Sequence, residues 1–476
     1  MTVRDRLMTA ALAVVATATV LVVGPSATAA TSTTSPTTTT VVPATATTTG
    51  IPAARSARSA RSARSASSTA AARLALPPAT GTFAVGRDTL HLVDTARRDP
   101  WEPTRPRELM VDVYYPAATP ASPGAGRGGP ARYADPAEIR LYLASLGLDG
   151  VLSATDIAAT TIVSRTGVRP LGGRHPLVLL SPGLGVGRRS LTGLAEQFAS
   201  RGYVAATVDH AYESVGTLFT GDRMLTCVAC DRLRDVSDFD AAVRSRTVDL
   251  SFVLDRLIGP RPAWRASATI DATRIAAVGH SLGGAAAVAL LAHDPRVRAG
   301  VDMDGTLADP ATPLVPAGLP GRAVLLLGAT PDHPAPGPGG QAPPGTSPDD
   351  YDPTWAQAWS LLRAPRLWLD VDGADHFSFT DDPVIADQLP PPPSTTGSTA
   401  GTGAGSGTGA GSTGGGGPTS NPAPPDGVAP TLSGARALAI TRVYVEAFVT
   451  RALTGRSAPI LDAPSRTYPE VRIIGH

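Results

Sequence analysis

The chain of 476 residues is poor in charge and contains no lysine. Charged residues make up 17% of it, against roughly 25% in an average soluble domain. The 41 basic and 40 acidic residues leave a formal net charge of +1, so no global field would attract nucleic acid. Because every basic residue is an arginine, mechanisms that use lysine as a Schiff base or general base are excluded.

Cysteine is nearly absent, since Cys227 and Cys230 are the only two. No second cysteine pair and no paired histidines complete a zinc ligand set, so we expect no metal and no other cofactor. A disulfide between the two cysteines is chemically permitted if the protein is exported.

Only one long apolar run is present, and it lies at the N-terminus. Arg4 and Arg6 precede the apolar segment 10–23, which Gly24 and Pro25 end before a group of small residues at 27–29. The run is about 14 residues long, shorter than the roughly 20 that a membrane-spanning helix needs. We therefore predict a signal peptide over residues 1–29 and a secreted, extracellular protein that is compatible with association with the cell envelope.

Low-complexity segments divide the rest of the chain. Residues 30–78 are rich in Thr and in Ala-Arg-Ser repeats and are predicted to form a disordered stalk, and residues 390–430 form a Pro/Gly/Ser/Thr insertion of linker composition. Residues 79–389 are predicted to be the catalytic domain, to which residues 431–476 return as a final helix and tail, with Gly455 as the helix cap. We expect one domain with disordered insertions and no partner subunit.

Between these segments, strand-like and helix-like patterns alternate. The expected strands are Leu109–Tyr115, Pro176–Ser181, Tyr203–Val208, Arg274–Val278, Val297–Met303, Ala323–Leu327 and Leu367–Val371. The expected helices are Leu191–Arg201, Val236–Ile258, an Ala-rich helix from Ser281, and the last helix around Ile440–Phe448. This alternation predicts an α/β fold with a mainly parallel central sheet and helices on both faces.

A G-x-S-x-G segment follows the expected strand Arg274–Val278 and precedes a helix. Gly279 and Gly283 flank Ser281 at a distance of two residues on either side. A serine at the tip of so sharp a turn needs neighbours without Cβ atoms, because the strained backbone brings those positions into contact. The segment therefore predicts a nucleophile elbow with Ser281 as the nucleophile.

A nucleophilic serine needs a base, and the base needs a carboxylate that holds its tautomer. His376 follows the last expected strand, where the Ser, acid, His order of this architecture places the base. Either Asp304 or Asp332 fits as the acid, and we favour Asp304 because it follows a strand directly while Asp332 lies in a Pro/Gly-rich loop. Asp302 is expected to be an ordinary strand-end carboxylate.

The oxyanion of the reaction needs two convergent backbone N–H groups. We expect one from Leu282, next to the nucleophile, and one from Leu184 in the Gly-rich turn after the strand Pro176–Ser181. Arg188 and Arg189, just beyond that turn, could meet a phosphate or carboxylate of the substrate, but we expect them to face water. Of the other histidines, His210 is expected to orient a loop. The remaining ones are expected to be ordinary surface residues, namely His91, His175, His293, His333 and His476.

Four segments together resemble the α/β-hydrolase family of plasma and type II platelet-activating-factor acetylhydrolases and its bacterial relatives. They are Leu179–Gly185, Gly279–Gly284, Asp302–Gly305 and Ala374–Phe379. The resemblance implies the α/β-hydrolase fold, the triad Ser281, Asp304 and His376, and metal-free hydrolysis of short or oxidised acyl esters of phospholipids. Two positions depart from the family pattern, since Pro182 replaces a frequent His and Leu282 replaces the Phe of mammalian members.

We therefore expect a secreted serine esterase that acts on a small-molecule or lipid ester through an acyl-enzyme, as a monomer with at most transient contact with a lipid surface. A cutinase, lipase or polyester hydrolase of the same fold is the first alternative. A catalytically idle protein that binds the cell envelope through its stalk is an alternative of another class.

Overall fold

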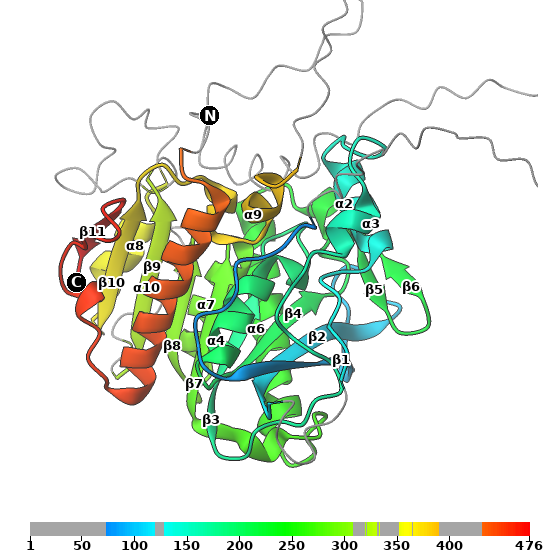
Figure 1. Cartoon of the computed structure of the whole chain (residues 1–476), viewed down its shortest axis with the longest axis horizontal. Coiled ribbons are helices and arrows are strands. Elements are labelled where there is room, and N and C mark those ends of the chain that lie inside the picture. Colours follow the sequence, from blue (N-terminus) through cyan, green and yellow to red (C-terminus); the bar gives the residue numbers. More distant parts are fainter. Residues whose placement is uncertain are drawn as a thin grey trace, which may run out of the picture. The chain divides into compact units, whose positions relative to one another are not determined.

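The computed structural model of the protein describes residues 73–119, 128–307, 319, 321–330, 333, 352–363, 365–389 and 431–476 (Figure 1). The predicted signal peptide, most of the predicted stalk, the insertion 390–430 and the alternative acid Asp332 lie outside these residues. The packed chain begins earlier than the predicted boundary at residue 79. Leu74 and Leu76 are buried against helices α2 (Pro136–Ser145) and α3 (Ala154–Ala158), because both are apolar residues at the end of the polar stalk sequence.

A nine-stranded sheet forms the centre of the described chain, in the order β1-β2-β4-β3-β7-β8-β9-β10-β11. The strands are β1 (Ala84–Arg98), β2 (Pro106–Ala117), β3 (His175–Ser181), β4 (Val204–His210), β7 (Ile270–His280), β8 (Val297–Met303), β9 (Ala323–Ala329), β10 (Arg366–Val371) and β11 (Val471–Gly475). The six strands from β4 to β10 pair in parallel, whereas β1, β2 and β11 pair antiparallel at the two edges. The predicted mainly parallel sheet is confirmed.

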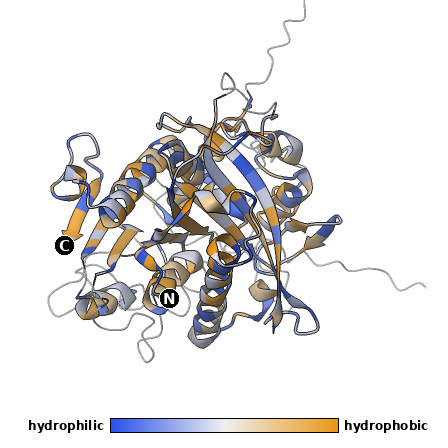
Figure 2. Cartoon of the chain, turned by 90° about the horizontal axis from the view of Figure 1, so that it is seen from below, coloured by the Kyte–Doolittle hydropathy of each residue, from blue (hydrophilic) through white to orange (hydrophobic). Residues whose placement is uncertain are grey.

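Helices cover both faces of this sheet. Helices α4 (Thr192–Ser200) and α10 (Gly434–Thr454) pack on one face, while α6 (Val236–Ile258), α7 (Leu282–His293) and α8 (Thr354–Leu361) pack on the other. In Figure 2 the strands carry many hydrophobic residues, and the helices around them show both hydrophobic and hydrophilic residues. Successive residues of β3 point to the two cores in turn, which is why its sequence is a continuous apolar run instead of an alternating one.

The shorter elements surround this frame. They are α2 (Pro136–Ser145), α3 (Ala154–Ala158), the hairpin of β5 (Thr217–Phe219) and β6 (Arg223–Leu225), α5 (Val228–Arg232) and α9 (Asp382–Ala386). Cys227 and Cys230 form a disulfide at the start of α5. Gly455 ends α10 in the left-handed conformation at φ 69°, as predicted. Within the described residues, no helix has both the length and the hydropathy of a membrane span.

Candidate active site

Ser281 lies in the turn between β7 and α7, at the carboxyl end of the parallel strands. Its φ of 54° places a non-glycine residue in a strained conformation. A Cβ atom on Gly279 would lie 2.0 Å from the carbonyl oxygen of Gly283, and one on Gly283 would lie 2.1 Å from that of Ser181. The backbone approach inferred from the glycine spacing is therefore present, and the Ser281 side chain stays partly exposed.

Asp304 follows β8 and is also strained, with φ 59°. Its Oδ2 lies 2.7 Å from Nδ1 of His376, and its Oδ1 accepts a 2.7 Å hydrogen bond from the N–H of Ala329. Burial by itself would raise the pKa of Asp304, but the hydrogen bond from His376 and the nearby His333 outweigh it and lower the pKa to about 2. Asp304 is therefore a carboxylate at neutral pH and accepts both bonds.

His376 opens the short helix η5 (His376–Phe379), which follows β10. Because its partner Asp304 is ionised, Nδ1 must carry the ring proton, so Nε2 is the unprotonated nitrogen of the neutral ring. The His376 side chain is 21% exposed, while Asp304 behind it is fully buried. This is the tautomer that a general base for a serine requires.

His280 connects this base to the serine turn. Its ring centroid lies 4.7 Å from that of His376, and its Nε2 donates a 2.7 Å hydrogen bond to the backbone carbonyl of His376. Burial and the neighbouring His376 lower the pKa of His280 to about 3, so its ring is neutral. The elbow motif identified His280 only as a neighbour of Ser281, and nothing in the sequence indicated this second contact.

The turn after β3 lies against the elbow, as required of an oxyanion hole. A Cβ atom on Gly183 would lie 3.3 Å from Cβ of Ser281. Leu282 is the first residue of α7, where an N–H group has no acceptor within its own helix. Among the described residues, no backbone carbonyl accepts a hydrogen bond from the N–H of Leu184 either. Both amides proposed as oxyanion donors therefore belong to segments that border Ser281.

Two residues near Asp304 lie in surroundings that the sequence did not indicate. His333, expected on the surface, is 4% exposed and stacks on Trp355 at 3.8 Å. Its Nε2 lies 3.9 Å from Oδ1 of Asp304, so the surface interpretation is wrong. Asp302 is not an ordinary strand-end carboxylate, because it is fully buried, accepts a hydrogen bond from the N–H of Gly305, and has its pKa raised well above the usual range by burial.

His175, at the start of β3, was also expected on the surface. It is buried, and its Nδ1 lies 2.8 Å from the backbone carbonyl oxygen of Gly202.

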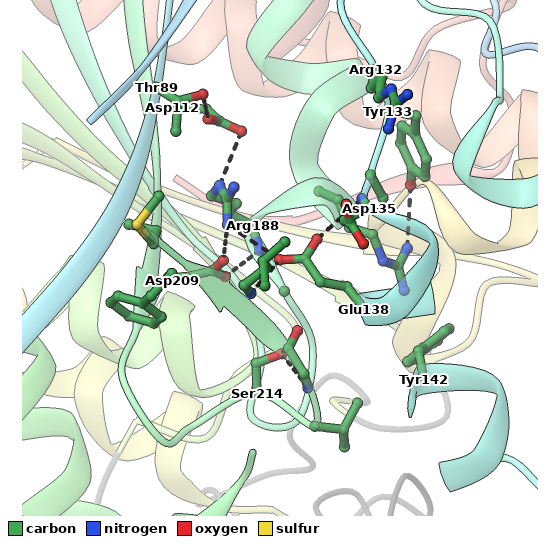
Figure 3. Close-up of a pocket in the computed structure, with 18 of the residues that line it drawn as sticks. Thr89, Asp112, Arg132, Tyr133, Asp135, Glu138, Tyr142, Arg188, Asp209 and Ser214 are labelled. Atoms are coloured by element: carbon green, nitrogen blue, oxygen red, sulfur yellow. Dashed lines mark hydrogen bonds and ion pairs between the residues drawn. The ribbon is translucent and has the colours of Figure 1, made fainter. Parts of the chain in front are cut away.

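A cavity of about 280 Å³ lies beyond the turn that follows β3, residues 182–185, with Gly187 in its wall. This turn is called the oxyanion turn below, after the role expected of Leu184. Figure 3 shows Arg188 between Asp112 and Asp209, with Glu138 and Tyr142 on α2 beside them. Nε of Arg188 lies 3.0 Å from Oδ2 of Asp112, and Nη1 pairs with Asp209. The expectation that Arg188 faces water is wrong, because neighbouring strands supply carboxylates that pair with the arginine, whose side chain is only 14% exposed.

No family model matches the chain. A probable 1-alkyl-2-acetylglycerophosphocholine esterase of Arthroderma benhamiae is 28% identical over 420 residues, which are 83% of this chain and 92% of that protein. A platelet-activating factor acetylhydrolase of Cavia porcellus is 25% identical over 164 residues, which are 28% of this chain and 35% of that protein. A solved structure of a ferulic acid esterase from Streptomyces cinnamoneus aligns with a TM-score of 0.65 and 36% identity, covering 85% of this chain and all of that one.

Proposed function

We propose that Ser281, His376 and Asp304 are the catalytic triad of this chain. The chain belongs to the α/β-hydrolase esterases related to platelet-activating-factor acetylhydrolases and is a carboxylic ester hydrolase. The observation that carries this proposal is the 2.7 Å contact between Asp304 and Nδ1 of His376, beside a serine held at φ 54°. The carboxylate of Asp304 accepts the Nδ1–H hydrogen bond and so keeps neutral His376 in the tautomer that can accept a proton from a hydroxyl group.

In the proposed mechanism, Oγ of Ser281 attacks the ester carbonyl carbon while Nε2 of His376 takes its proton. The negative charge on the carbonyl oxygen is stabilised by the N–H groups of Leu282 and Leu184. As the intermediate collapses, His376 gives the proton to the oxygen of the departing alcohol. The acyl group stays bound to Oγ of Ser281. A water molecule then attacks the acyl carbon while His376 takes its proton, and His376 returns that proton to Oγ of Ser281 as the bond to the acyl group breaks and the acid is released.

We propose short-chain or oxidised acyl lipids as the substrate class. The names of the relatives from Arthroderma benhamiae and Cavia porcellus support an acetyl ester. The cavity beside the oxyanion turn is lined by charged side chains such as Arg188 and by apolar ones such as Met110 and Phe219, so it offers contacts to both the polar and the apolar parts of such an ester.

Two other ester classes remain in the same proposal. The similarity to a ferulic acid esterase, at 36% identity over the whole of that chain, favours an aromatic acyl group as the second candidate. A cutinase or lipase activity on longer acyl chains is the third. The N-terminal pattern of Arg4, Arg6 and the apolar run supports secretion of the enzyme.

The test is hydrolysis of an ester series that runs from acetyl to long-chain acyl and includes methyl ferulate, in detergent-free buffer. Ser281→Ala should remove all enzyme-dependent hydrolysis and all labelling by an organophosphonate. Ser360→Ala, which alters an exposed serine on α8, is the matched control and should leave both unchanged. Undiminished hydrolysis by Ser281→Ala would refute the triad, and complete inactivity of the wild type would favour the envelope-binding alternative.

The position of the rate maximum in the series separates the substrate classes. A maximum at acetyl supports the short-acyl proposal and directs the next measurement to phospholipids. A maximum at methyl ferulate would replace it with an aromatic acyl group, and rates that rise with chain length would replace it with a lipase or cutinase activity.

A further inference from the structure

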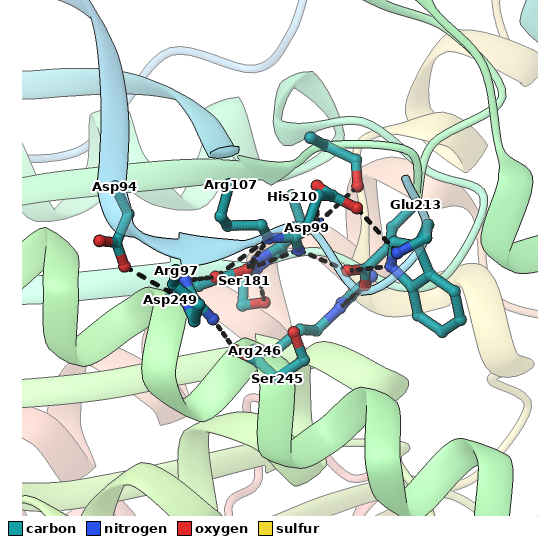
Figure 4. Close-up of polar contacts among 12 residues, drawn as sticks. Asp94, Arg97, Asp99, Arg107, Ser181, His210, Glu213, Ser245, Arg246 and Asp249 are labelled. Carbon is teal, nitrogen blue, oxygen red and sulfur yellow. Dashed lines mark hydrogen bonds and ion pairs between the residues drawn. The ribbon is translucent and has the colours of Figure 1, made fainter. Parts of the chain in front are cut away.

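A second Ser–His–Asp arrangement lies beneath the oxyanion turn. Oγ of Ser181 lies 3.0 Å from Nε2 of His210, and Nδ1 of His210 lies 2.6 Å from Oδ2 of Asp249 (Figure 4). Ser181 and Asp249 are fully buried and His210 is 2% exposed, so no substrate reaches this serine. Ser181 is also an ordinary residue of β3, without the strained backbone of Ser281. The arrangement is therefore not a second nucleophilic site, and its role must come from the segments of the chain that it holds in position.

The set belongs to a larger buried cluster of charges. Arg107 donates hydrogen bonds to Asp99, Glu213 and Asp249, and Nε of Arg246 donates a 2.7 Å bond to Oε2 of Glu213. Three arginines face three carboxylates. They are Arg97, Arg107 and Arg246 against Asp99, Glu213 and Asp249. Such a balanced set ties β2, β4 and α6 into one block, since each buried charge has its partners.

This block reaches the oxyanion turn from both sides. Nη1 of Arg246 donates a 2.5 Å hydrogen bond to the carbonyl oxygen of Pro182. On the other side, the N–H of Gly185 donates a 2.8 Å bond to the backbone carbonyl of Glu213, the residue whose side chain pairs with Arg246. The two anchored peptide groups flank the one between Gly183 and Leu184, which carries the N–H proposed to bind the oxyanion.

We propose that Arg246, paired with Glu213, is a positioning residue for the oxyanion hole. A peptide group is planar, so holding the carbonyl of Pro182 and the N–H of Gly185 sets the planes on both sides of the Leu184 amide. Few torsions then remain free at Gly183 and Leu184. An amide aimed in advance at the developing charge needs no reorganisation during the reaction, which is the condition for strong stabilisation. This inference rests on the proposed function of Ser281 and Leu184.

The role depends on the shape of the arginine side chain as well as on its charge. The guanidinium group bonds to Glu213 through Nε and to Pro182 through Nη1, on two edges of one rigid plane. The ammonium group of a lysine is a single point on a flexible stem and does not reproduce that fork. Replacing Arg246 with lysine therefore preserves the charge balance of the cluster while it releases the fixed orientation of Pro182.

The test compares Arg246→Lys with the matched control Arg97→Lys. Arg97 belongs to the same cluster through Asp249 but contacts Ser245 and Asp94 at its other end, away from the turn. For each protein, kcat and KM are measured on the best ester, with active sites counted by organophosphonate titration. The Ki of a trifluoromethyl ketone, which forms a tetrahedral oxyanion with the serine, is measured beside them.

We expect kcat of Arg246→Lys to fall by about tenfold to a hundredfold, as is typical of a displaced catalytic group, with KM within about twofold of the wild-type value. The Ki of the ketone should rise by the same factor as kcat/KM falls. Arg97→Lys should keep the wild-type kcat and Ki per active site. A purely structural role of Arg246 would instead lower stability and leave both values unchanged per titrated site, and that result would overturn the inference.

Two further results separate a failure of the proposed function from a failure of the inference about Arg246. If the wild type does not bind the ketone or react with the phosphonate, the proposed function fails, whatever the variant does. If Arg246→Lys does not fold, Glu213→Gln decides, because it keeps the backbone carbonyl that binds Gly185 and removes the charge that holds Arg246, together with one of the three carboxylates around Arg107. A lower kcat at constant KM in Glu213→Gln supports the inference, and unchanged kinetics contradict it.

Discussion

Nε2 of His280 lies 2.7 Å from the backbone carbonyl oxygen of His376, so the residue just before the proposed nucleophile holds the residue proposed as its base. Since a carbonyl only accepts hydrogen bonds, Nε2 of His280 must carry a proton, and the lowered pKa keeps the other ring nitrogen unprotonated. The relationship fixes the His376 loop to the elbow, and a second protonation of His280 would keep this hydrogen bond but place a charge in a fully buried position beside His376.

The neutral state of His280 predicts a loss of stability in mild acid. Its folded pKa of about 3 lies below the ordinary value of 6.5, so between these values the unfolded chain binds more protons than the folded one. The stability from His280 is present above pH 6.5 and decreases as the pH falls. We expect its share of the free energy of unfolding to drop by about 2 kcal/mol between pH 7 and pH 5.

His280→Gln checks this share, because its amide can still donate to the His376 carbonyl and does not titrate. Urea unfolding at pH 7, 6 and 5 should show the wild type losing more stability than the variant. His210, whose pKa burial also lowers, is present in both proteins and cancels in the comparison. Parallel stability curves for the two proteins would contradict the assignment.

Asp304→Asn should impair catalysis while preserving the fold. The amide oxygen of asparagine can still accept from the N–H of Ala329, but it no longer carries the charge that holds the proton of His376 on Nδ1. We expect kcat to fall by about 10³- to 10⁴-fold, as when a triad acid loses its charge. Asp372→Asn, at an exposed carboxylate after β10, is the control, and equal activity in the two variants would exclude Asp304 as the acid.

Gly283→Ala should be strongly destabilising. The new Cβ atom would lie 2.1 Å from the carbonyl oxygen of Ser181 and 2.5 Å from that of Pro182, so the oxyanion turn would have to move. We expect a loss of at least about 2 kcal/mol in the free energy of unfolding, together with a loss of activity. Gly172→Ala, with no atom within 4 Å of the new Cβ, should change stability by less than about 0.5 kcal/mol. Equal thermal shifts in the two variants would show that the turn relaxes freely.

The disulfide between Cys227 and Cys230 should contribute little to stability. It closes a loop with a sequence separation of 3, so it restricts the unfolded chain only slightly. The double variant Cys227→Ser/Cys230→Ser should lose no more than about 2 kcal/mol and keep wild-type kcat and KM. Denaturant unfolding and ester hydrolysis of the variant check both statements, and a loss of activity without unfolding would reveal a role of α5 in the site.

Local sequence patterns predicted the interior of the fold well. Helix α6 has the predicted bounds Val236–Ile258, because its apolar residues repeat with the helical period and Asp235 caps its first turn. Strand β8 likewise matches Val297–Met303. The edge strands β1 and β11 were missed, since one is long and mixes polar with apolar residues and the other is only five residues long. Edge strands are stabilised by pairing with a neighbour that their own sequence does not reveal.

The serine turn follows from local sequence alone, because the steric demand for Gly279 and Gly283 arises within five consecutive residues. The carboxylate that meets His376 depends on long-range packing, since Asp304 lies 72 residues away and is brought there by the order of strands in the sheet. The same holds for Arg246, which meets Pro182 across 64 residues. A local pattern records the conformation that a segment prefers, whereas contacts between distant segments depend on how the whole sheet and its helices pack.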